Sequence, residues 1–187
     1  LPTVHIDESN IGDLIEVSGT AVLNGDKLVG FLDKDETRYF LWTADRLKGG
    51  RINLEVKIDN QPIVITLEIL SNKTQLEPVI QDGELIMKIN VKETIINIGE
   101  IDGTSNPMTK SGILNLKSEG ERYVKESIES TVKKVQKNYK CDIFGFSTVI
   151  RNKYPDYWRK IEDDWKKNFS KLPIEVNVNF DITGKSS

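Results

Sequence analysis

The stretch that decides the fold is GTAVLNGDKLVGFLDKDETRYFLWTADRLKGG, residues 19–50. Residues 20–23 and 27–32 are rich in strand-forming side chains, and Asn24-Gly25 lies between them. Because Asn-Gly adopts positive φ at both centres of a type I′ turn, the stretch predicts a β-hairpin. A helix should follow, with an apolar side and an end at Gly49-Gly50. The residues of that apolar side are Phe40, Leu41, Ala44 and Leu47.

The acidic run DKDE, residues 33–36, has two readings. Three carboxylates within four residues could hold a cation, but the run lacks the glycine and the spacing of a calcium loop. Asp33 or Asp35 could instead cap the helix, with Glu36 in its first turn. We favour capping, because an N-cap together with the interaction of first-turn carboxylates with the helix dipole accounts for the run.

Outside this unit, apolar residues alternate with polar ones in several runs, which predicts strands. The predicted strands are residues 14–23, 27–32, 51–58, 63–69, 74–80, 85–98 and 174–182. Between the last two of them, apolar residues recur at helical spacing. The helices predicted there are residues 118–139, 144–152 and 156–170.

Strands first, helices second and one strand last predict an α+β fold. We expect an antiparallel sheet of about six to seven strands, with about three to four helices packed mainly on one face. The final strand returns to the sheet after the helices, and a central position is one option. Residues 1–13 are interpreted as a lead-in or linker, and residues 14–187 as a single domain.

The composition excludes several classes of function. With 26 basic and 29 acidic residues the net charge is −3, so the chain has no excess of cations for binding nucleic acid. No apolar run approaches the ~20 residues that span a bilayer. The chain starts at Leu1 without a methionine, so we expect a processed or excised piece of a longer protein.

No residue pattern predicts catalysis, a cofactor or a metal site. Cys141 is the only cysteine and has no neighbouring histidine to activate it, so it is interpreted as a structural or surface thiol. Trp158, Trp165 and Phe169 lie at helical spacing. That stripe is more often core, but a tryptophan pair could anchor a partner surface instead.

Two blocks of sequence together resemble a known family. The first is residues 19–32 followed by Glu36, Thr37 and Arg38; the second is DIFGF at residues 142–146, then Tyr154-Pro155, the aromatic stripe and the 174–182 strand. Their order resembles the C-terminal domain of the Ger(x)C family, the C subunits of spore germinant receptors. Tyr39 departs from the pattern, where many members are expected to have glycine.

The resemblance implies a non-enzymatic lipoprotein on the outer face of the inner spore membrane. It implies that a signal peptide and a lipid-modified, palmitate-bearing cysteine lie on the missing N-terminal part, so that this piece is itself soluble. It also implies partners: an integral-membrane A subunit and a transporter-like B subunit, which together respond to nutrients and trigger germination of the spore after sporulation.

Three hypotheses follow, and we rank them. The first is a scaffolding and interaction domain of a germinant receptor, with Arg38, Trp42 and Trp158 as candidate contact residues. The second is a module that binds a small molecule, which could be the germinant. The third is an unrecognised hydrolase that uses acidic residues, which would need two carboxylates at a productive separation.

Overall fold

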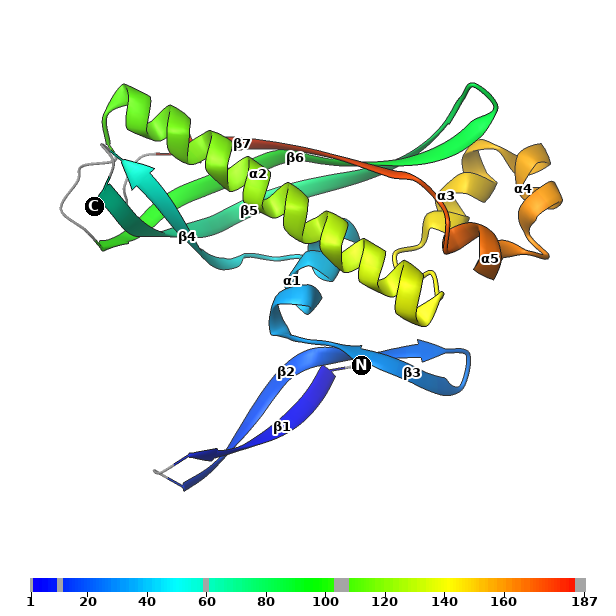
Figure 1. Ribbon diagram of the computed structural model, residues 1–187, viewed down its shortest axis with the longest axis horizontal. Coiled ribbons are helices and arrows are strands. Elements are labelled where there is room, and N and C mark those ends of the chain that lie inside the picture. The colour runs from blue at the N-terminus through cyan, green and yellow to red at the C-terminus, as the bar shows by residue number, and fades with distance from the viewer. Residues whose placement is uncertain (1, 10–11, 59–60, 103–107, 184–187) are drawn as a thin grey trace.

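The computed structural model describes residues 2–9, 12–58, 61–102 and 108–183 (Figure 1). Within them the strands are β1 Pro2–Ser9, β2 Gly12–Asn24, β3 Lys27–Leu32, β4 Gly50–Ile58, β5 Gln61–Gln81, β6 Glu84–Asp102 and β7 Ile174–Thr183. The helices are α1 Lys34–Thr43, α2 Lys110–Lys134, α3 Phe146–Lys153, α4 Pro155–Ile161 and α5 Trp165–Phe169, and a π-helical turn, η1 Val135–Tyr139, extends α2.

These strands form two sheets, in the orders β1-β2-β3 and β4-β5-β6-β7. The α+β class and the return of the last strand are confirmed, but the prediction of one antiparallel sheet is wrong. β7 lies at the edge of the larger sheet, not in its centre, and pairs parallel to β6. Parallel pairing requires a long crossover, and the helices α2 to α5 supply it.

The first strand corrects the interpretation of residues 1–13 as a lead-in. Pro2–Ser9 pairs antiparallel with β2 and forms one edge of the small sheet. The sequence analysis missed this strand because a short strand at the edge of a sheet can form through backbone hydrogen bonds to one neighbour, here β2.

Turn chemistry sets the hairpins. Asp82 and Gly83 both have positive φ, 51° and 82°, and join β5 to β6 as the centres of a two-residue turn. In the β2–β3 hairpin Asn24 pairs with Lys27, so the centres are Gly25 and Asp26, and not Asn24 and Gly25 as predicted. Gly25 alone of the two has positive φ, at 64°.

Capping residues decide where helices begin and end. Asp33 and Glu36 form a complete capping box on α1, which confirms the capping interpretation. The helix ends at Thr43, because Asp45 turns the chain with φ of 56°, so the predicted end at Gly49-Gly50 is wrong.

The longer helices also differ from their predicted bounds. The Thr109 side chain accepts a hydrogen bond from the Gly112 N–H and starts α2 at Lys110, two turns before the predicted residue 118. The helix predicted at residues 156–170 is two short helices, α4 and α5, interrupted at residues 162–164.

Helix α2 lies across one face of the larger sheet (Figure 1). On β5 the residues Ile63, Ile65, Leu67 and Ile69 are buried, and they alternate with residues that are more exposed. Gly120 permits the close approach of α2, since a Cβ there would lie 3.1 Å from the Phe180 ring. Within the described residues, no helix has both the length and the apolar composition needed to cross a bilayer.

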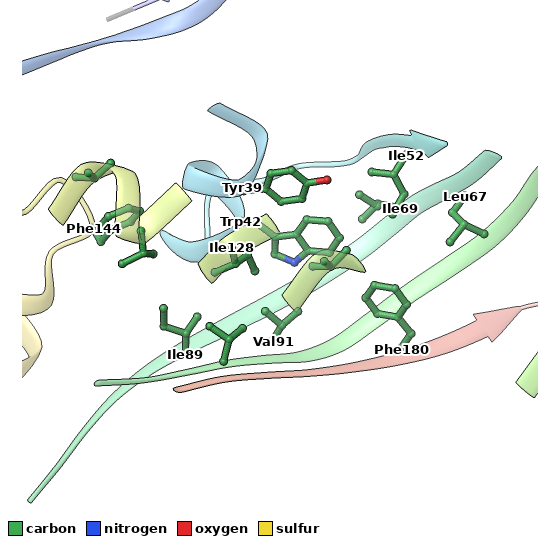
Figure 2. Close-up of a cluster of buried hydrophobic side chains, with 14 of the residues drawn as sticks. Tyr39, Trp42, Ile52, Leu67, Ile69, Ile89, Val91, Ile128, Phe144 and Phe180 are labelled. Atoms are coloured by element: carbon green, nitrogen blue, oxygen red, sulfur yellow. The ribbon is translucent and has the colours of Figure 1, made fainter. Parts of the chain in front are cut away.

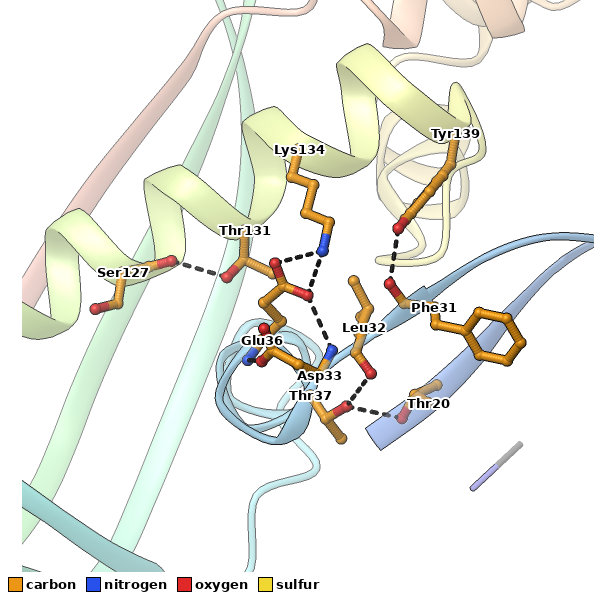
Figure 3. A network of polar contacts seen from close by, with 10 residues as sticks. All are labelled: Thr20, Phe31, Leu32, Asp33, Glu36, Thr37, Ser127, Thr131, Lys134 and Tyr139. Carbon is orange, nitrogen blue, oxygen red and sulfur yellow. Dashed lines mark hydrogen bonds and ion pairs between the residues drawn. The ribbon is translucent and has the colours of Figure 1, made fainter. Parts of the chain in front are cut away.

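Polar contacts attach the small sheet and α1 to the end of α2 (Figure 3). The Lys134 ammonium lies 2.5 and 2.6 Å from the two Glu36 carboxylate oxygens. The Tyr139 hydroxyl donates to the Phe31 carbonyl at 2.7 Å. These bonds join the beginning of α1 and strand β3 to the same end of α2.

Candidate interaction surfaces

Trp42, one of the three predicted contact residues, belongs to the core. It has no exposed surface and stacks between Tyr39 and Phe180, with ring centroids 6.4 and 6.2 Å away (Figure 2). A side chain without exposed surface cannot contact a partner in the folded state, so its assignment to an interface is wrong. The larger sheet and α2 cover it, and neither could be placed over it from the sequence.

Arg38, the second predicted contact residue, is half-buried and lies in a polar groove. Its guanidinium pairs with the Asp35 carboxylate at 2.8 Å, one turn earlier on α1. The groove has a volume of about 450 Å³. Its lining comes from α1, β4, β5 and α2, and consists of Asp35, Arg38, Arg51, Asn53, Thr66 and Tyr123.

Trp158, the third predicted contact residue, is half-buried on α4 and supports a second groove. Its ring packs edge-on against Trp165 at 5.2 Å, and the Trp165 indole N–H donates to the Asp142 carboxylate at 3.3 Å. The groove, of about 410 Å³, lies between the β5–β6 hairpin and helices α4 and α5. Its lining includes Leu85, Tyr157, Ile161, Trp165, Lys171 and Leu172.

The aromatic stripe is therefore partly core and partly available to a partner or ligand. Phe169 is fully buried, whereas Trp165 lines the groove and Trp158 lies beside it, half-exposed. Sequence reasoning missed the groove itself, because its other wall is the tip of a hairpin about 80 residues earlier in the chain. Only helical spacing pointed to this region.

The outer face of the β2–β3 hairpin is a third exposed surface, which the sequence analysis did not identify. Leu23 and Leu28 are paired across the two strands and are 39% and 54% exposed, and Phe31 is 51% exposed. In the sequence, apolar residues fall on both faces of this hairpin, and this pattern could have indicated an exposed apolar face.

Among the described residues, the Cys141 thiol and the possible metal ligands are the first groups to consider for catalysis. Burial and the neighbouring Asp142 raise the pKa of the Cys141 thiol, and its Sγ contacts the Leu23 carbonyl oxygen at 3.4 Å, so the reactive thiolate is disfavoured. No group of three or more His, Cys, Asp or Glu within the described part of the chain could hold a metal ion.

One groove between α1 and α2 does gather carboxylates, from Asp33, Asp35, Glu36 and Glu126. Each of them has a partner elsewhere. Asp33 and Glu36 form the capping box, Asp35 pairs with Arg38, and Glu126 pairs with Arg122. Because the carboxylates already stabilise helices, this groove does not favour the hydrolase hypothesis.

Sequence comparison places this α+β chain in a family. Residues 18–185 match the family described as "Spore germination B3/GerAC like, C-terminal". The chain therefore belongs to the GerAC-like C-terminal domain family, as the two sequence blocks predicted.

Named relatives and a solved structure agree with this placement. The chain is 32% identical to spore germination protein B3 of Bacillus subtilis (strain 168) over 88% of its length, and 29% identical to spore germination protein YndF of the same organism over 90%. The crystal structure of the GerBC protein superposes with a TM-score of 0.76 at 28% identity, over 92% of this chain and 53% of that one. The chain spans about 43% of the B3 protein and 42% of YndF.

Proposed function

We propose that this chain is the C-terminal domain of a germinant-receptor C subunit and takes part in triggering spore germination as a scaffolding and contact domain, without turnover of a substrate. The observation that carries the proposal is the family match across residues 18–185. The geometry is consistent with it, since Asp33 and Glu36 are engaged in a helix cap, Asp35 in an ion pair, and burial raises the pKa of the Cys141 thiol.

We further propose that the partners are the receptor's membrane subunits A and B. The half-exposed Arg38 and Trp158 are the predicted residues that still have surface for such a contact. Tryptophan is enriched among the interface residues that contribute most of the binding energy, and Trp158 packs against the Trp165 ring. In this proposal a lipid anchor outside this chain holds the whole protein on the outer face of the inner spore membrane.

The test is co-purification of the A and B subunits with the tagged full-length protein from spore membranes. We expect Arg38→Ala or Trp158→Ala to reduce recovery of the partners several-fold while the protein stays folded. Lys133→Ala is the control for Arg38, because Lys133 also forms an ion pair within one helix, with Glu129 on α2, and lines neither groove. If Arg38→Ala and Trp158→Ala both recover the partners as well as the unchanged protein does, these residues are not part of the interface. If spores that lack the protein germinate normally, the proposed role in germination is wrong.

A second candidate function, binding of a small molecule, is favoured by the groove beside Trp165. Its volume of about 410 Å³ lies within the range of ligand pockets, and it joins an apolar floor to the polar groups of Tyr157 and Lys171. Calorimetry with a panel of amino acids, sugars and nucleosides tests this role. Heats that disappear in Trp165→Ala would support it, and silence across the panel would exclude it.

A further inference from the structure

The polar groove around Arg38 is built mainly of hydrogen-bond donors. Two of its lining residues are arginines, each with five N–H donors, and the only carboxylate among them is Asp35. Apolar ligands gain little from such a lining, whereas an anion would find two cations and several neutral donors on the same wall.

The neutral donors are oriented by their neighbours. The Thr66 hydroxyl donates to the Asn53 side-chain carbonyl oxygen at 3.1 Å, across the β4–β5 pair. This bond occupies the acceptor end of the Asn53 amide and leaves its NH₂ group to donate. Tyr123 adds a phenol from α2, with its ring edge-on to Tyr39 at 6.5 Å.

Within the described part of the chain, each of the two guanidinium groups pairs with one carboxylate, and both pairs are at least partly exposed. Asp35, the partner of Arg38, has a side chain 70% exposed, and Arg51, which is itself 70% exposed, lies 3.5 Å from Glu68. Exposed pairs of this kind contribute about 0–1 kcal/mol. A bound anion can therefore replace them at little cost and gain a bidentate arrangement that suits guanidinium.

From this geometry we infer that the groove binds a small oxyanion with at least two negative charges, either a phosphate ester or a di- or tricarboxylate. The volume of about 450 Å³ accommodates a molecule of that size. Arg38 and Arg51 bind the oxygens, Asn53 and Tyr123 donate further hydrogen bonds, and Asp35 competes with the ligand for Arg38. The inference goes beyond the role as a contact domain and does not depend on the A and B subunits.

The test is titration of the purified chain at constant ionic strength with inorganic phosphate and, separately, with citrate. Binding is followed by nuclear magnetic resonance of the Asn53 side-chain amide and by calorimetry. We expect saturation with one molecule per chain, and the tighter of the two probes identifies the ligand as phosphate or carboxylate. Arg38→Gln and Arg51→Gln should each weaken binding about tenfold, the loss expected for one charge-assisted contact of roughly 1.4 kcal/mol.

Two further variants make the test specific. Asp35→Asn should tighten binding several-fold, because it removes the competing carboxylate, and a merely structural role of Arg38 would not produce that gain. Arg159→Gln breaks an equivalent exposed pair outside the groove and should leave affinity unchanged. Absence of saturation, or equal weakening by Arg159→Gln, would overturn the inference, since either result indicates only non-specific attraction of anions.

Discussion

At the scale of single residues, Trp42 shows how neighbours decide the role of a side chain. Sequence analysis placed it with the contact residues, but it stacks between Tyr39 and Phe180 from α1 and β7. Tyr39, at the position where the sequence analysis expected glycine in many family members, is itself 4% exposed and packs within the core.

Replacing Trp42 should destabilise the fold strongly. Trp42→Ala leaves a cavity in the core, so we expect the free energy of unfolding to fall by about 3–5 kcal/mol. Urea denaturation measures this loss. Trp158→Ala is the control and should cost clearly less, because that side chain is half-exposed. A loss below about 1 kcal/mol for Trp42→Ala would contradict its position in the core.

Burial raises the pKa of Tyr39 to about 12, above the ordinary 10.0. The folded state therefore holds the phenolic proton more tightly than the unfolded state does. This contribution to stability is complete below pH 10 and is lost as the pH rises towards 12, with an upper limit of roughly 2–3 kcal/mol. In Tyr39→Phe this part of the alkaline decline should disappear. Denaturation midpoints between pH 9 and 11 provide the comparison, and identical slopes in both proteins would refute it.

At the scale of elements, strand β3 and the end of α2 can pack closely because residue 30 of β3 is a glycine and has no side chain. A Cβ on Gly30 would lie 2.2 Å from the Tyr139 ring, so glycine at this position lets Tyr139 reach the Phe31 carbonyl. The spacing that predicted β3 did not explain why a glycine lies within it. The explanation is Tyr139, more than 100 residues later, whose ring occupies the space beside Gly30.

Gly30→Ala should push Tyr139 away and cost about 1–3 kcal/mol, as overpacking generally does. The cost should shrink in a Tyr139→Ala background, because the clash is then absent. Tyr139→Phe removes only the hydrogen bond and should cost about 1 kcal/mol. Thermal unfolding of the four variants tests the coupling, and fully additive effects would show that the two residues do not meet.

The Glu36–Lys134 pair joins α1 to α2 within the same junction. Burial lowers the pKa of the Lys134 ammonium, but the hydrogen bond and charge of Glu36 outweigh this effect, so the pKa lies above its ordinary value. We expect a double-mutant cycle of Glu36→Gln and Lys134→Met to give a coupling energy of about 0.5–1 kcal/mol that declines with salt. Gln at position 36 can still complete the capping box, so helix loss does not confuse the result. A coupling near zero at low salt would mean that the pair does not stabilise the junction.

At the scale of the whole molecule, the two sheets share one hydrophobic core. Val22 and Leu32 of the small sheet belong to the same buried cluster as Ile65 and Ile96 of the larger one. Helix α1 lies between them and contacts β2, β3, β5 and α2 (Figure 1). We therefore expect both sheets to lose structure together.

In a urea titration, the amide signals of Val22 and of Ile65 should disappear at the same midpoint, coincident with the change in tryptophan fluorescence. Earlier loss of the Val22 signal would indicate that the small sheet unfolds separately. The Tyr139→Ala variant, which lacks one of the bonds at the junction, should be the first in which the midpoints diverge.

Local sequence determined a substantial part of this protein. Alternation of apolar residues determined most of the strands, the Asp33–Glu36 pattern determined a cap, and Asp82-Gly83 determined a hairpin, because each of these depends on residues within a few positions. The ordered blocks of residues also determined the family. Arg38 lines the polar groove, and its contact role stays a prediction.

Only the tertiary structure decided the division into two sheets, the edge position of β7, the burial of Trp42, and the grooves around Arg38 and beside Trp165. Each of these brings together segments that are far apart in the chain. Periodicity shows which face of an element is apolar, but it does not show which other element covers that face. That choice depends on packing and hydrogen bonding between distant residues, and those contacts exist only in the folded molecule.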